Sequence, residues 1–189
     1  MTDVSSQPHA VSEAERRLRA EFPVVVEWPV AWAEMDYFRH VNHAVFFTYF
    51  EGARIAYLER IGFRELSAEQ QVGPILQATS ARYRRPVVYP DVVVIGARVT
   101  EVGEDRFTQE YRIVSRAQGE VAAEGGGTLV AYDYAAGRKT PLPERVREAI
   151  RALEASVALE TNSLNTCWKI FCRGKLSKRS LYEIGRAHV

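Results

Sequence analysis

The greater part of this chain contains no cysteine. The sequence has 189 residues and two cysteines, Cys167 and Cys172, both near the C-terminus. They lack the second ligand pair of a zinc site, and two cysteines do not make a disulfide framework. We therefore expect one domain held together by its hydrophobic core, with no metal and no cofactor.

Long hydrophobic runs are also missing. No apolar stretch reaches the roughly 20 residues that a membrane-spanning helix needs. The N-terminus lacks the basic start and the apolar segment of a secretory signal. The sequence therefore predicts a cytoplasmic protein with no membrane partner.

An excess of positive charge is absent from most of the chain. There are 25 basic and 24 acidic residues in all, for a formal net charge of +1. Residues 161–189 hold six of the basic residues and one of the acidic ones, which leaves 19 and 23 in residues 1–160. Proteins that bind the nucleic-acid backbone usually carry a basic excess, so we expect no nucleic-acid partner.

Residues 161–189 differ from the rest in composition. They contain both cysteines, three of the four lysines and two of the three asparagines. The last six residues, Ile-Gly-Arg-Ala-His-Val, resemble a translated sequencing adapter. We interpret this segment as out-of-frame or adapter-derived sequence rather than a native basic tail. The chain then divides into a mobile arm of residues 1–20, a folded domain of residues 21–160 and this non-native tail.

Deletion of residues 161–189 tests this interpretation. We expect the shortened protein to keep the thermal unfolding midpoint and the activity of the full chain, measured side by side. Loss of either property on deletion would show that the segment is native.

One long helix dominates the sequence before residue 70. Apolar residues recur at helical spacing from Val45 to Ile61 and extend beyond one stripe, which indicates a helix wrapped by other structure. Asn42 is the expected N-cap and Gly62 the expected stop. A shorter helix of residues 12–20 is suggested by the capping-box spacing at its start.

Most of the remaining sequence predicts strands. Five segments have strand patterns: residues 22–32, 74–83, 92–102, 106–114 and 121–134. Pro29 places the first strand at an edge or a bulge, and the three consecutive glycines 125–127 indicate a bulge or a close backbone approach. An amphipathic helix of residues 141–159 follows.

These elements favour an α+β fold, in which an antiparallel five-stranded sheet curls around the long helix. Such a sheet leaves edge strands unpaired, so we expect a homodimer or a larger assembly.

Two motifs resemble a known family. The first is Trp-Ala-Glu-Met-Asp36-Tyr-Phe-Arg-His-Val-Asn-His-Ala-Val-Phe-Phe-Thr-Tyr-Phe-Glu-Gly-Ala-Arg54, and the second is Tyr83-Arg-Arg-Pro86-Val-Val-Tyr-Pro-Asp91. In this order they resemble the hotdog-fold acyl-CoA thioesterases of the 4-hydroxybenzoyl-CoA thioesterase type, over about residues 24–143. The resemblance implies a hotdog fold, an acyl-CoA substrate, hydrolysis without a metal or cofactor, and a homodimer or homotetramer.

The resemblance also implies roles for single residues. It places the family carboxylate at Asp36, as nucleophile or as general base for water. The backbone amide of His43 would stabilise the oxyanion at the start of the helix, and Asn42 would cap the helix and support the turn. Taken alone, Asp36 would more often be a turn residue. Glu51 is a competing catalyst, because a related lineage places its carboxylate on this helix, although an ion pair with Arg54 is its expected role.

Substrate binding is assigned on the same basis. His40 and Phe46 are expected to line the pocket. The phosphates of CoA favour arginine, and three candidates stand beside the Pro86 corner: Arg82, Arg84 and Arg85. The alternative for these arginines is an ordinary solvated face. Arg39 stands where many family members have glycine, which leaves the backbone path of the turn open.

Two other functions are weighed against the hydrolase. A non-catalytic acyl-CoA-binding hotdog module would keep the fold and bind the ligand without reaction. A hotdog dehydratase is disfavoured, because its catalytic histidine in a Gly-x-x-Phe-Pro context is not found. The side chains of His40 and His43 lack a Ser or Cys partner in the sequence, so we expect them to be structural or to line the substrate.

Overall fold

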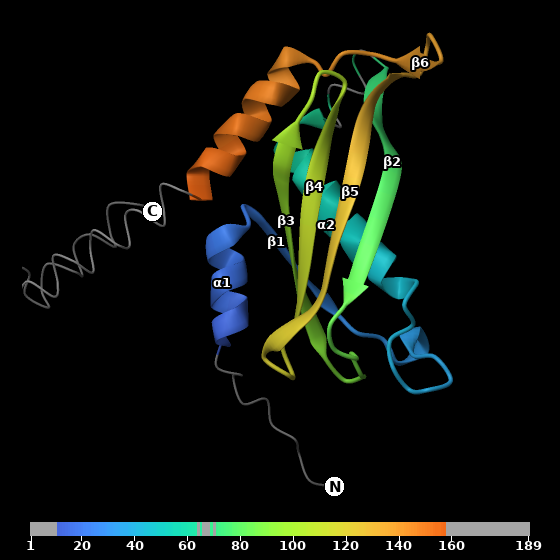
Figure 1. Ribbon diagram of the computed structural model, residues 1–189, viewed down its shortest axis with the longest axis vertical. Helices are drawn as coiled ribbons and strands as arrows, with labels where there is room; N and C mark the ends of the chain where they lie inside the picture. The colour runs from blue at the N-terminus through green and yellow to red at the C-terminus, as the bar shows by residue number, and fades with distance from the viewer. Residues whose placement is uncertain (1–10, 64, 66–68, 70, 158–189) are drawn as a thin grey trace, which may run out of the picture.

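Figure 1 shows the computed structural model, which describes residues 11–63, 65, 69 and 71–157. Its centre is an antiparallel sheet with the strand order β1-β3-β4-β5-β2, and β6 pairs with β5 outside this path. The strands are β1 (Val24–Pro29), β2 (Val72–Tyr83), β3 (Val92–Val102), β4 (Arg106–Ser115), β5 (Glu120–Asp133) and β6 (Arg138–Lys139). The predicted five-stranded sheet is confirmed, and β6 is an addition that the sequence did not indicate.

The long helix α2 (Val45–Arg60) crosses one face of this sheet and lies behind it in Figure 1. Its buried residues pack against β1, β3 and β4. They are Phe46, Tyr49, Phe50, Ala53, Arg54, Tyr57 and Leu58. Ile55 points away and is exposed, so a single chain covers one side of the helix only. Gly62 follows in the left-handed conformation, with φ +67°, and ends the helix as predicted.

The glycine run of β5 allows α2 to approach the sheet closely. A Cβ atom on Gly125 would lie 2.5 Å from the ring of Phe50. The register shifts fall elsewhere, between Leu76 and Ala78 on β2 and at residues 121–123 of β5. Of the two predicted explanations for the glycines, close backbone approach is therefore the correct one.

The first strand is shorter than predicted. β1 ends at Pro29, which lies at the edge of the sheet as expected. The sequence predicted a strand that continues to Trp32. A 3₁₀ helix, η1 (Trp32–Glu34), follows and turns the chain toward Asp36. Proline has no amide hydrogen for the ladder, which explains why pairing ends there.

A second helix, α1 (Glu13–Glu21), packs on the sheet and contacts β1, β3, β4 and β5. The predicted start of this helix is confirmed, since Ser12 is its N-cap and Ser12 Oγ accepts the amide hydrogen of Glu15 at 3.1 Å. Leu18 and Phe22 form a separate apolar cluster with strand residues. The sequence placed residues 1–20 in a mobile arm, but residues 13–20 form part of the folded body, and residues 1–10 lie outside the described residues.

A buried carboxylate ties α1 to the sheet. Glu15 is 1% exposed, and it pairs with Arg116 at 3.0 Å and with Arg19 at 2.8 Å. Burial raises the pKa of Glu15, but the two arginines outweigh burial and hold this pKa below its ordinary 4.5. Because the pKa is lower in the folded state, the stabilisation from these ion pairs is present above the ordinary pKa of 4.5. It is lost as the pH falls below 4.5 and through the lowered pKa of the folded state.

Residues 144–157 form the last described helix, which begins three residues later than predicted. Glu154 anchors it, because one of its carboxylate oxygens accepts hydrogen bonds from the Tyr57 hydroxyl and the Val99 amide, each at 2.7 Å. None of the described helices is long and apolar enough to cross a membrane. The predicted non-native tail, residues 161–189, lies outside the described residues.

Candidate active site

The turn of residues 36–40 is closed by backbone hydrogen bonds. An isolated bridge pairs Met35 with Val41 at its base. The amide of Asp36 donates to the carbonyl of His40 at 2.8 Å, and the amide of Arg39 donates to the carbonyl of Asp36 at 3.0 Å. Arg39 adopts the left-handed conformation, with φ 62°, which glycine tolerates far better than arginine. The turn therefore keeps a path suited to glycine although arginine occupies it.

The carboxylate of Asp36 is only partly used by this turn. Oδ1 accepts the amide of Phe38 at 2.8 Å and that of His40 at 3.4 Å. Oδ2 accepts no hydrogen bond from the described residues, and Asp36 lines a pocket. Asp36 thus has the turn role that the sequence offered as the simpler explanation, and it retains one oxygen for chemistry.

The start of α2 differs from the prediction by two residues. The helix begins at Val45 with Ala44 as its N-cap, so Asn42 is not the N-cap. Asn42 instead forms a tight turn before the helix, in which its Oδ1 accepts the amide of Ala44 at 2.9 Å and its carbonyl accepts the amide of Val45. These two hydrogen bonds agree with the role expected for Asn42 in supporting the turn. The amide of His43 donates to no group among the described residues.

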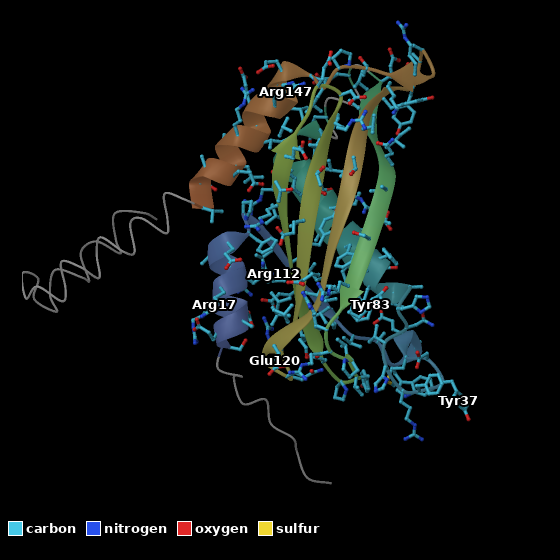
Figure 2. All side chains as sticks on the ribbon, in the orientation of Figure 1. Arg17, Tyr37, Tyr83, Arg112, Glu120 and Arg147 are labelled. Atoms are coloured by element: carbon cyan, nitrogen blue, oxygen red, sulfur yellow. The ribbon has the colours of Figure 1, made fainter. Side chains whose placement is uncertain are left out.

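The second motif joins the first at this point. The Tyr83 hydroxyl donates to the carbonyl of His43 at 3.1 Å, and the amide of Val41 donates to the carbonyl of Val87 at 2.8 Å. The Tyr83 ring meets Phe46 edge-on at 5.1 Å. Figure 2 shows Tyr83 where β2 ends beside the start of α2. The sequence placed Tyr83 in a motif but predicted no role for it in the site.

A pocket of about 330 Å³ unites these residues. Its lining combines the carboxylate, the start of α2 and the corner after β2: Asp36, Val41, His43, Phe46, Tyr83, Arg84, Arg85 and Pro86. Five predicted site residues therefore come together. His40 and Asn42 take part through the turn but do not line the pocket, and Arg82 lines a separate pocket with Thr108 and Glu110.

The two arginines in this pocket already have partners. Arg84 pairs with Glu124 through a hydrogen bond of 2.9 Å from its Nε, and Arg85 pairs with Glu120 at 2.7 Å. Exposed pairs of this kind contribute at most about 1 kcal/mol, so a phosphate could displace either carboxylate. Their expected role in phosphate binding stays a prediction.

The competing carboxylate lies elsewhere. Glu51 is exposed on α2 and pairs with Arg54 at 3.3 Å, as the sequence predicted. It does not line the pocket that contains Asp36. The described part of the chain contains no group of three His, Cys, Asp or Glu side chains that could hold a metal ion.

Comparison with known proteins matches this architecture to one family. The family model of the thioesterase-like superfamily matches residues 30–150. A thioesterase from Thermus thermophilus, solved with coenzyme A and Zn, is 38% identical, covers 71% of this chain and 96% of its own, and has a TM-score of 0.64.

Two curated relatives match with lower identity. The long-chain acyl-CoA thioesterase FadM of Escherichia coli is 23% identical over 119 residues, which are 63% of this chain and 90% of FadM. Protein THEM6 of Danio rerio is 29% identical over 99 residues, 52% of this chain, and the match spans 49% of THEM6. Because the family model covers more than half of the sequence and the hotdog architecture is present, this chain belongs to the thioesterase-like superfamily.

Proposed function

We propose that this protein hydrolyses an acyl-CoA thioester to a free acid and CoA. One observation carries the proposal: Asp36 and His43 line the same pocket at the start of a long helix. Neither Asp36 Oδ2 nor the His43 amide has a hydrogen-bond partner among the described residues. The named relatives support the substrate class, since one is solved with coenzyme A and another is a long-chain acyl-CoA thioesterase.

The geometry supports a two-part reaction. The thioester carbonyl oxygen accepts a hydrogen bond from the His43 amide. The positive end of the α2 dipole favours the negative charge that develops on this oxygen. Asp36 either takes a proton from the attacking water or attacks the carbonyl carbon itself, to give an anhydride that water then opens. In both routes the carbon–sulfur bond breaks, and the CoA thiolate leaves and takes up a proton.

The test is release of free thiol from a panel of short-chain, long-chain and aromatic acyl-CoAs by the purified protein. We expect turnover with at least one of them, and the preferred chain reports the shape of the pocket. Tight binding of acyl-CoA without thiol release from any member would overturn the proposal in favour of a binding module. The predicted cytoplasmic location is independent of this assay and stays a prediction.

We further propose that two copies pair through β2. Among the described strands this one pairs with β5 alone, so one side of its 12 residues is an open edge. Ile75 and Leu76 on it are 37% and 38% exposed. The opposite edge, β1, is shorter and ends in Pro29, a feature that discourages pairing with another strand. Pairing of β2 with its symmetry mate would extend the sheet across a dimer.

Ile75→Lys tests this interface. Sedimentation should show a dimer or a larger assembly for the unchanged protein and a shift toward monomer for the variant, because a lysine on the pairing edge discourages pairing with another strand. Val102→Lys is the control, since Val102 has the same exposure, 37%, on β3 inside the sheet. A monomeric unchanged protein, or equal assembly in all three proteins, would contradict the proposed interface.

A further inference from the structure

A second pocket shares Asp36 with the first. It holds about 660 Å³, twice the 330 Å³ of the pocket that contains His43. Its lining comes from η1, the turn and the corner after β2: Trp32, Ala33, Met35, Asp36, Arg39, Val88 and Tyr89. A ligand bound at Asp36 therefore has two spaces available, a smaller one at the start of α2 and a larger one beside the turn.

Arg39 brings a guanidinium to the larger pocket, and the carboxylate that also lines this pocket, Asp36, forms no ion pair with it. The guanidinium groups of Arg84 and Arg85 in the smaller pocket are paired with glutamates, whereas Arg39 forms no ion pair within residues 11–63, 65, 69 and 71–157. Its backbone also keeps the left-handed conformation, with φ 62°. An arginine there is less favourable for folding than glycine, which agrees with a role for its side chain in binding.

The other walls of the pocket suit a nucleotide. Trp32 is 72% exposed and Tyr89 is 46% exposed, and both offer aromatic faces on which a base can stack. An arginine beside such faces provides the planar donors that phosphate groups prefer. The exposed aromatic surface and the Arg39 guanidinium are thus matched to the two ends of a phosphorylated nucleoside.

We propose that Arg39 binds a phosphate of CoA, and that the larger pocket receives the phosphate-bearing arm while the smaller one receives the acyl group. This inference rests on the proposed hydrolase function, because the thioester must lie at Asp36, between the two spaces. It makes Arg39, rather than the paired Arg84 and Arg85, the specificity-determining residue for CoA. A substrate without phosphate would lose this contact.

Arg39→Gly tests the assignment against three thioesters with the same acyl group. We expect KM for acyl-CoA to rise by about 10- to 100-fold and KM for acyl-pantetheine, which has no phosphate, to stay unchanged. Acyl-4′-phosphopantetheine identifies the phosphate involved: an equal rise points to the 4′-phosphate, and no rise points to the nucleotide phosphates. Both outcomes support the proposal.

Two further measurements keep the test decisive. Calorimetric titration with coenzyme A alone should show the same loss of affinity in Arg39→Gly, and this readout does not require turnover. The unfolding temperature of the variant should be unchanged or higher, because glycine removes the left-handed strain. Arg138→Ala is the control, since Arg138 lies on β6 at the opposite end of the molecule from the turn (Figure 1).

Equal changes in KM for acyl-CoA and acyl-pantetheine, or unchanged affinity for coenzyme A, would overturn the assignment even if the protein is a thioesterase. Conversely, an absence of turnover with normal, Arg39-dependent binding of coenzyme A would overturn the hydrolase function and leave the binding site intact.

Discussion

Asp36→Asn should lower kcat for acyl-CoA hydrolysis by about 100- to 10,000-fold, with a small effect on KM. The amide has nearly the shape of the carboxylate, and its oxygen can still accept the Phe38 amide that closes the turn at 2.8 Å. It cannot take a proton from water or attack a carbonyl carbon. The fold and the pocket should therefore survive while the chemistry is lost, and steady-state thiol release measures the difference.

Asp133→Asn provides the matched control for this substitution. Asp133 also supports a turn, because its Oδ1 accepts the amide of Ala136 at 2.8 Å. It lies at the end of β5 and does not line the pocket of Asp36. We expect its kcat to equal that of the unchanged protein. Full activity in Asp36→Asn, or equal losses in the two variants, would remove Asp36 from the mechanism.

Gly125→Ala should lower the free energy of unfolding by about 1–3 kcal/mol, because it overpacks the contact between α2 and the sheet. The new Cβ would lie 2.5 Å from the Phe50 ring and 2.7 Å from the backbone carbonyl of Ser80. Phe50 cannot easily withdraw, since it is fully buried and stacks on Tyr111 at 5.1 Å. The loss corresponds to roughly 2–4 °C in unfolding temperature for each kcal/mol.

The neighbouring glycine separates this contact from a general effect of alanine. A Cβ on Gly126 would meet the Gln109 carbonyl at 3.4 Å and Ser80 Oγ at 3.7 Å, which are ordinary contacts. The free energy of unfolding of Gly126→Ala should therefore lie within about 0.5 kcal/mol of that of the unchanged protein. Similar unfolding temperatures for the two variants would show that the approach of Phe50 is not what requires glycine at position 125.

Local patterns were sufficient for much of the fold. Alternation in residues 74–83 and 106–114, together with valine-rich segments and turn residues, predicted the five main strands. Apolar residues all around the segment predicted the buried helix, and Gly62 predicted its end. The prediction of the helix start was wrong, because short-range hydrogen bonds of a side chain compete with the capping role that the residue type suggests. Asn42 has the chemistry of an N-cap, but its side chain closes a turn of its own, so the helix begins at Val45. Such competition depends on the backbone path, which side-chain identity alone does not determine.

In the candidate site, residues within one segment were predicted from the sequence, whereas contacts between distant segments were not. The motif around Asp36 identified the carboxylate and the amide of His43, because both lie within one continuous segment. Tyr83 was missed as a site residue, since its contact with the carbonyl of His43 joins residues 40 positions apart. The partners of Arg84 and Arg85 on β5 were equally invisible, because only strand register brings Glu124 and Glu120 beside them.

The sequence by itself thus determined the family and the order of the elements, and it predicted the segment proposed to carry the chemistry. These properties are recorded in local composition and spacing. Only the tertiary structure decided which arginines near the candidate site form ion pairs. Sequence proximity favoured Arg84 and Arg85, whereas folding pairs both with glutamates and leaves Arg39, beside Asp36, without an ion-pair partner in the described part of the chain. The physical reason is that a charge is neutralised by its neighbours in space, and the fold of the sheet and the turn sets those neighbours.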